Sequence, residues 1–94
     1  MQLIELDASG WAKPLDFYLA LLPQLGAPEW HGLNLDALYD SLLGDINAVE
    51  PPFSVTIRNI DRLPAEMADF MMRVATVFAD ARQDHGVDVT LQLI

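Results

Sequence analysis

The sequence predicts an α/β fold: a small three-stranded parallel sheet packed with helices, in the order β-α-α-β-α-β. Three short runs rich in β-branched and apolar residues alternate with segments in which apolar residues recur at helical spacing. Strands separated by helical segments need crossover connections, which make neighbouring strands parallel. A chain of 94 residues is long enough for one core and too short for two. We therefore expect a single domain over residues 1–94.

The first strand and the first helix are expected in the N-terminal quarter of the chain. Residues 3–6 alternate as a short strand, and a turn follows at residues 8–10. A helix can begin at Pro14, because the missing N–H of proline costs nothing at the first helical position. The segment from 23 to 28, with its prolines and Gly26, is expected to end this helix. The positions expected to face the core are Leu15, Tyr18, Leu19 and Leu22.

The second helix is expected to begin after Asn34, whose side chain is a good N-cap, and to close at Gly44. Its apolar stripe consists of Leu35, Leu38 and Leu42. A helix turns by about 100° per residue, so Asp36 and Asp40 lie together on the side away from this stripe. We expect both carboxylates to project into solvent.

The second half of the chain is expected to add a strand, a long helix and a last strand. Pro51 precedes an alternating strand at residues 53–57. Pro64 lies near the start of the helix, Gly86 follows its end at His85, and residues 87–93 form the third strand. The apolar face of the helix consists of Met67, Phe70, Met71, Val74, Val77, Phe78 and Ala81.

The composition favours a folded cytoplasmic protein. Hydrophobic residues make up 52% of the chain and charged residues 20%, which is far from the composition of disordered chains despite the net charge of −9. The absence of cysteine excludes a disulfide framework, a thiolate metal site and a cysteine nucleophile, and it fits a reducing compartment. The N-terminus is acidic where a signal peptide needs bases, and no apolar run reaches the length of a membrane span.

The charge is unevenly distributed along the chain. There is no lysine or arginine between Lys13 and Arg58, so this stretch would repel phosphate backbones and anionic lipid. Its acidic residues are Asp16, Glu29, Asp36, Asp40, Asp45 and Glu50. We expect no direct nucleic-acid or membrane partner. Acidity that serves solubility alone remains an alternative explanation.

Aromatic residues flank the two aspartates of the second helix. Trp30 and His31 precede this helix in a loop, and Tyr39 lies within it. Aromatic side chains beside acids are typical of protein-binding surfaces, where the aromatics supply binding energy and the acids supply steering and specificity. The alternative for Trp30 is that it covers the core, because large aromatic side chains are highly buried on average.

Other chemistry has little support in the sequence. Asp36 and Asp40 could form an acid–base pair only in unequal surroundings, which an exposed helix face does not supply. Together with His31 and Asp80 they offer ligand types for a divalent metal, but no metal-binding helix motif is present. No Gly-rich phosphate loop or nucleophile elbow occurs. We expect no enzymatic activity, no metal and no cofactor.

One motif identifies a family. The pattern Pro-Glu-aromatic-x-Gly-x-Asn-Leu-Asp-Ala-Leu-aromatic-Asp covers residues 28–40, and Gly44 follows it. This segment resembles the central part of barstar-family ribonuclease inhibitors, and the resemblance continues through residues 78–82 and 86–91. It implies a barstar-like fold and a cytoplasmic inhibitor that inserts an acidic helix and the preceding loop into the active site of a basic ribonuclease. In that arrangement the carboxylates take the place of substrate phosphates, with Asp40 as the central anchor. The partner-binding residues that the resemblance implies are Trp30, His31, Gly32, Asn34, Asp36, Tyr39, Asp40, Gly44 and Asp80.

Several of these positions depart from the family pattern. Trp30 and His31 replace tyrosines, and Tyr39 replaces a tryptophan. Leu33 stands where a family member has an acid, and Asp80 is shorter than the usual glutamate. The implied partner is a basic extracellular-type, barnase-like ribonuclease. The alternative is an interaction module or immunity protein of the same fold that binds a different basic protein or toxin.

Overall fold

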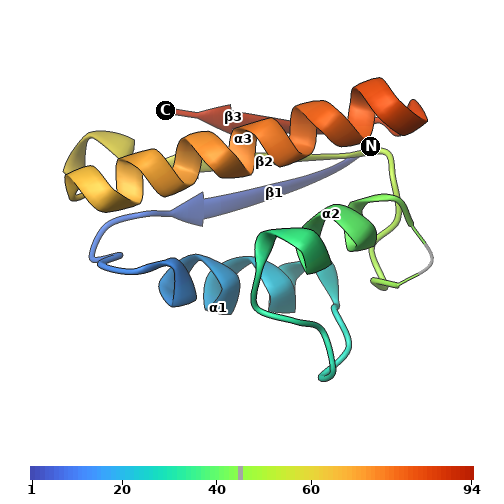
Figure 1. Cartoon of the computed structure of the whole chain (residues 1–94), viewed down its shortest axis with the longest axis horizontal. Helices are drawn as coiled ribbons and strands as arrows, with labels where there is room; N and C mark the ends of the chain where they lie inside the picture. Colours follow the sequence, from blue (N-terminus) through green and yellow to red (C-terminus); the bar gives the residue numbers. More distant parts are fainter. Residues whose placement is uncertain (45) are drawn as a thin grey trace.

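The computed structural model describes residues 1–44 and 46–94, and Figure 1 shows how its elements are arranged. The α/β class and the order β-α-α-β-α-β are confirmed. Asp45, which belongs to the acidic stretch of the sequence, lies outside the described residues. The elements are β1 (Gln2–Asp7), α1 (Pro14–Leu25), α2 (Leu35–Leu42), β2 (Phe53–Arg58), the 3-10 helix η1 (Ile60–Arg62), α3 (Ala65–His85) and β3 (Val89–Leu93).

The three strands form a parallel sheet in the order β1-β2-β3. Burial alternates along the central strand: Phe53, Val55 and Ile57 are buried, whereas the residues between them are partly exposed. In the register of the sheet Val55 lies beside Ile4 and Leu91, which places their side chains on the face that packs against the helices. The opposite face carries the row Glu5, Thr56 and Gln92. This face suits contact with water, although parallel sheets usually have both faces covered.

Helix α1 begins at Pro14 as expected, and Tyr18 and Leu22 are buried as expected, but the other two expected core positions are not. Leu15 and Leu19 are 36% and 60% exposed. The run is apolar on nearly every side, so two different stripes fit helical spacing, and the stripe with the larger aromatic side chains is the one that is buried. The helix ends inside the expected segment 23–28, at Leu25 before the left-handed Gly26, so that Pro23 lies within its last turn. The buried residues of α1 are Phe17, Tyr18, Leu21, Leu22 and Leu25.

Helix α2 packs against α3, and in Figure 1 it lies beside the C-terminal part of that helix. Leu38 and Leu42 are fully buried, while Leu35 is partly buried. The C-cap of α2 is Leu43 rather than Gly44. Gly44 is the next residue and has a φ of 102°, a conformation that favours glycine.

Helix α3 follows its expected pattern closely. Val77 is partly buried, and the other expected core positions of the helix are buried. Met72, next to the buried Met71, is 64% exposed. The helix ends at Gly86 in the left-handed conformation, and β3 then begins at Val89, two residues later than expected. Within residues 1–44 and 46–94, no helix has the length and apolar character needed to cross a bilayer.

Candidate partner-binding surface

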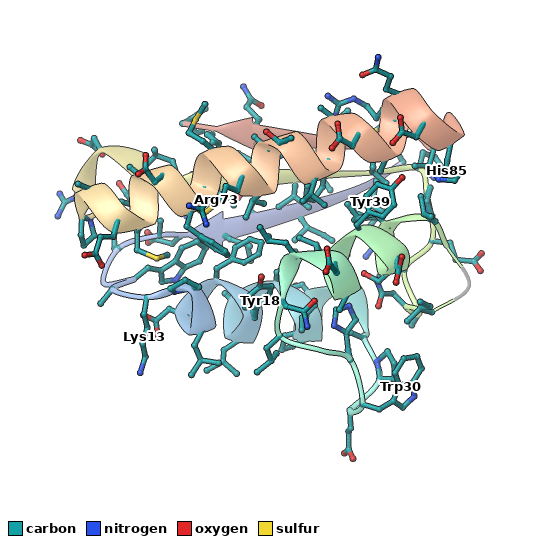
Figure 2. All side chains as sticks on the ribbon, viewed as in Figure 1. Lys13, Tyr18, Trp30, Tyr39, Arg73 and His85 are labelled. Carbon is teal, nitrogen blue, oxygen red and sulfur yellow. The ribbon has the colours of Figure 1, made fainter. Side chains whose placement is uncertain are left out.

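The loop before α2 presents Trp30 to solvent. The backbone N–H of His31 donates to the carbonyl oxygen of Pro28 over 3.0 Å, which closes a turn around Trp30. Figure 2 shows the Trp30 ring projecting away from the body of the protein, and 74% of this residue is exposed. Trp11, by contrast, is buried edge-to-face against Phe17. The alternative that Trp30 covers the core is therefore wrong.

His31, the neighbouring residue, lies on the inside of the loop. Only 7% of it is exposed, and its Nδ1 lies 2.7 Å from the carbonyl oxygen of Gly32. Its Nε2 is buried and has no hydrogen-bond partner among the described residues. Of the three aromatic side chains expected to flank the aspartates, His31 is therefore the one that is buried.

Gly32 and Asn34 join this loop closely to the start of α2. The Oδ1 atom of Asn34 accepts a hydrogen bond of 2.8 Å from the Ala37 N–H, which confirms Asn34 as the N-cap. A Cβ atom at Gly32 would lie 2.9 Å from Asn34 Nδ2 and 3.1 Å from Ala37 Cβ. Glycine is therefore the residue that lets the loop approach its own helix this closely.

Asp36 and Asp40 are both exposed on α2, one turn apart on the same side of the helix. Tyr39, next to Asp40, is partly buried between α2 and α3 (Figure 2). Its hydroxyl donates a hydrogen bond of 3.2 Å to Asp84 Oδ2, and its ring lies edge-to-face with His85 at 6.0 Å between centroids. Tyr39 thus connects the acidic side of α2 with the last turn of α3.

The surroundings of Tyr39 show that carboxylates from two helices gather there. Burial raises the pKa of the Tyr39 phenol, and the hydrogen bond to Asp84 raises it further. The negative charges of Asp84, Asp80 and Asp40 raise this pKa in the same direction, so all three act on one hydroxyl. Asp40 on α2 and Asp80 on α3 thus lie close enough for both charges to act on the same hydroxyl.

Asp84 belongs to this group although the sequence interpretation missed it. It is exposed and lies one turn after Asp80 on α3. The four-residue spacing of Asp80 and Asp84 could have indicated this in the sequence, because residues four apart on a helix share a face. We use the name acidic face below for Asp36, Asp40, Asp80 and Asp84 together with Tyr39.

The remaining expected residues lie at the two ends of α2. Trp30, Gly32 and Asn34 precede the helix, and Gly44 follows it. Leu33 also belongs to the preceding loop and is 50% exposed. The expected set therefore occupies one continuous stretch of loop and helix, to which α3 adds its acids.

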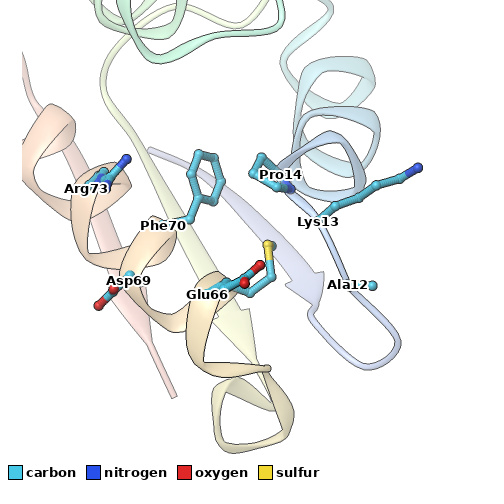
Figure 3. Close-up of a pocket in the computed structure, with 8 residues that line it drawn as sticks. Ala12, Lys13, Pro14, Glu66, Asp69, Phe70 and Arg73 are labelled. Carbon is cyan, nitrogen blue, oxygen red and sulfur yellow. The ribbon is translucent and has the colours of Figure 1, made fainter.

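A cavity of about 290 Å³ lies elsewhere, between the start of α1 and the first half of α3 (Figure 3). None of the expected partner-binding residues lines it. Its walls carry both signs of charge, and within residues 1–44 and 46–94 no cluster of three His, Asp or Glu side chains suits a metal ion. The cavity is lined by Ala12, Lys13, Pro14, Glu66, Met67, Asp69, Phe70 and Arg73.

The fold and the acidic face together describe a small acidic α/β protein with carboxylates presented from two packed helices. A family model described as Barstar (barnase inhibitor) matches residues 1–94, the whole chain. The protein therefore belongs to the barstar family. A comparison with curated proteins found no match.

Proposed function

We propose that the protein inhibits a basic, barnase-like ribonuclease by inserting α2 and the preceding loop into the active site of the enzyme. The observation that carries this proposal is that Tyr39, next to Asp40 on α2, donates a hydrogen bond to Asp84 on α3, one turn after Asp80. The stretch between Lys13 and Arg58, which contains α2, has no lysine or arginine to neutralise this charge. Membership of a family described as a barnase inhibitor supports the same function. The protein acts in the cytoplasm as one domain over residues 1–94, without catalysing a reaction.

The carboxylates take the place of substrate phosphates in this proposal. A ribonuclease holds the phosphate of its substrate with cationic side chains, and an ionised carboxylate offers them similar charge-assisted hydrogen bonds. Asp40 is the central anchor, with Asp36 beside it and Asp80 contributed by α3. The same charge repels RNA, so the inhibitor does not compete for the nucleic acid itself.

The other expected residues complete the surface. Trp30 and Tyr39 supply aromatic contact area. Gly32, Asn34 and the buried His31 hold the loop in place before the partner arrives, which reduces the entropy lost on binding. Gly44 marks the far edge of the surface, after the C-terminus of α2.

An inhibition assay tests the proposal. Purified protein is titrated into barnase while RNA cleavage is followed, and the wild type is expected to abolish cleavage near equimolar amounts. Asp40→Ala is expected to weaken inhibition at least about 30-fold, the lower range seen for truncated charge pairs in such complexes, barnase–barstar included. Asp61→Ala removes the same charge from η1 and serves as the matched control. Absence of inhibition by the wild type, or equal inhibition by Asp40→Ala, would contradict the proposal.

A different basic toxin is the second candidate target. The exposed Trp30 and the half-exposed Leu33 favour such a target, because both residues depart from the family pattern in the loop before α2. Affinity capture from the native cell with wild type and Asp36→Asn/Asp40→Asn proteins distinguishes the two candidates. A basic protein without nuclease activity that binds the wild type and not the double variant would decide for the second.

A further inference from the structure

The outer edge of β3 is open. Figure 1 shows β3 at one side of the molecule, and within the described part of the chain no strand pairs with its outer edge. The carbonyl oxygen of Asp88 accepts a hydrogen bond from β2, and the N–H of Ile94 donates one to β2. Alternate residues of a parallel strand bond to the same neighbour, so the even-numbered residues of β3 face β2. The backbone N–H and C=O groups of Leu91 and Leu93 therefore point outward.

The two edges of the sheet differ in charge. Proteins commonly protect an exposed strand edge with charged side chains or proline. The edge strand β1 follows this rule, because Glu5 and Asp7 are exposed on it. Residues 89–94 contain no charged side chain and no proline. A second copy of this chain, with its net charge of −9, can therefore meet the β3 edge without setting carboxylate against carboxylate, whereas it would be repelled at β1.

We propose that β3 pairs antiparallel with β3 of a second copy of this chain, around a two-fold axis at Gln92, so that one sheet continues across both copies. In this register Leu91 lies opposite Leu93 of the second copy, and these two residues exchange both of their outward hydrogen bonds. The axis repeats the same pair on its other side, so every outward group of the two leucines finds a partner. Gln92 then faces its own copy, and no charge lies at the axis.

Helix α3 presents small side chains beside this edge. Arg82 marks the side of α3 that faces β3, because its guanidinium donates a hydrogen bond of 3.0 Å to the carbonyl oxygen of Val89. Ala75 and Ala79 share this side, since they lie seven and three residues before Arg82 on the helix. The distance between packed helices depends on the side chains at the contact, so these alanines leave room for α3 of the second copy.

The pairing leaves the acidic face accessible. Two residues along a helix differ in direction by about 200°, so Asp84 lies on the side of α3 opposite to Arg82. On that side Asp84 contacts Tyr39 of α2. A pair of copies therefore presents two acidic faces, each free to bind its own partner. The inference does not depend on the proposed function.

Sedimentation equilibrium tests whether the protein pairs. The contact consists of one strand edge and one helix side, which is smaller than the stable interfaces that bury about 800 Å² per partner. We therefore expect a weak dimer, with an average mass that rises from the monomer value at about 10 µM toward twice that value at about 1 mM. Added salt should strengthen this dimer, because it screens the repulsion between two negatively charged copies. A protein that remains a monomer at 1 mM would overturn the proposal.

Amide hydrogen exchange followed by NMR locates the contact. The outward amides of Leu91 and Leu93 are expected to exchange about 5-fold more slowly at 1 mM than at 10 µM, as when about four-fifths of the chains are paired. The amide of Glu5 points outward from β1 and serves as the control, with the same rate at both concentrations. A dimer in which Leu91 and Leu93 exchange as fast as in the monomer would show that another surface is used.

A matched pair of variants tests the position of the axis. Gln92→Lys places two like charges directly opposite each other and should weaken dimerisation at least about 5-fold. Gln2→Lys makes the same change on the exposed end of β1 and should dimerise like the wild type. Gln92→Lys is expected to inhibit barnase as well as the wild type does, because Gln92 lies outside the acidic face. Equal dimerisation of the two variants would contradict an axis at Gln92.

Discussion

The Tyr39 hydroxyl donates a hydrogen bond of 3.2 Å to Asp84 Oδ2 and thereby ties α2 to the last turn of α3. The two helices that carry the acidic face are thus joined by a polar contact in addition to their packing against each other. The contact also orients Tyr39, whose neighbour Asp40 is the anchor in the proposed function. Changes at Asp84 should therefore be measurable at the Tyr39 phenol.

Asp84→Asn is expected to lower the pKa of the Tyr39 phenol, because it removes the nearest negative charge and weakens the hydrogen bond. The folded-state pKa is raised, so Tyr39 contributes stability that is present below pH about 10 and lost as the pH rises through its folded value. A Tyr18→Phe background leaves Tyr39 as the sole tyrosine, and its ultraviolet absorbance then follows the titration. Asp61→Asn should leave the titration unchanged. A Tyr39 titration that is identical with and without the Asp84 charge would count against the contact.

Gly32→Ala is expected to destabilise the protein by about 1 kcal/mol, the usual size of a lost N-cap. The added methyl group would meet Asn34 Nδ2 at 2.9 Å and displace the side chain that caps α2. In an Asn34→Ala background the same change should cost less, because the displaced cap is already absent. Urea unfolding of the four proteins in this cycle measures the difference. Fully additive losses would show that Gly32 and the cap are independent.

Leu21→Ala and Leu19→Ala separate the observed buried face of α1 from the expected one. Leu21 is fully buried, and its truncation is expected to cost about 2–5 kcal/mol in unfolding free energy. Leu19 is 60% exposed, so its truncation should cost less than about 0.5 kcal/mol. Chemical denaturation provides both values. Comparable losses at the two positions would contradict this orientation of α1.

Asp7 lies outside the acidic face, and its lowered pKa gives a further prediction. Its Oδ1 accepts hydrogen bonds of 2.7 Å from Asn59 Nδ2 and 2.9 Å from the Ser9 N–H, and these lower the Asp7 pKa to about 2. The contribution of the ionised Asp7 carboxylate to the stability of the fold is therefore present above pH 3.8 and lost as the pH falls toward about 2. Asn59→Ala should raise the Asp7 pKa and weaken this acid dependence. NMR titration of the Asp7 carboxyl measures the pKa, and an unchanged value would exclude Asn59 as its main cause.

Regular spacing explains which parts of the structure the sequence could predict. The core face of α3, the Asn34 cap and the exposure of Asp36 and Asp40 follow from helical geometry and local hydrogen bonding. On α1 the same helical spacing wrongly predicted Leu15 and Leu19 as core residues, because a helix that is apolar on several sides has no unique apolar stripe.

Neighbouring loop residues show a different limit to what the sequence can predict. Trp30 and His31 are adjacent aromatic side chains in a loop, where no period distinguishes inside from outside. The turn at residues 28–31 decides that Trp30 is exposed and His31 buried. The Tyr39–Asp84 contact joins residues 45 positions apart, and it depends on how α2 packs on α3 rather than on either local sequence.

The surface that binds the partner can be mapped directly. Amide chemical shifts of isotope-labelled protein are compared with and without unlabelled barnase, under conditions in which barnase cleavage of RNA is inhibited. The account predicts the largest changes at residues 29–33, along α2 and at residues 80–85 of α3. Changes confined to the cavity between α1 and α3, or to the open face of the sheet around Thr56, would contradict it.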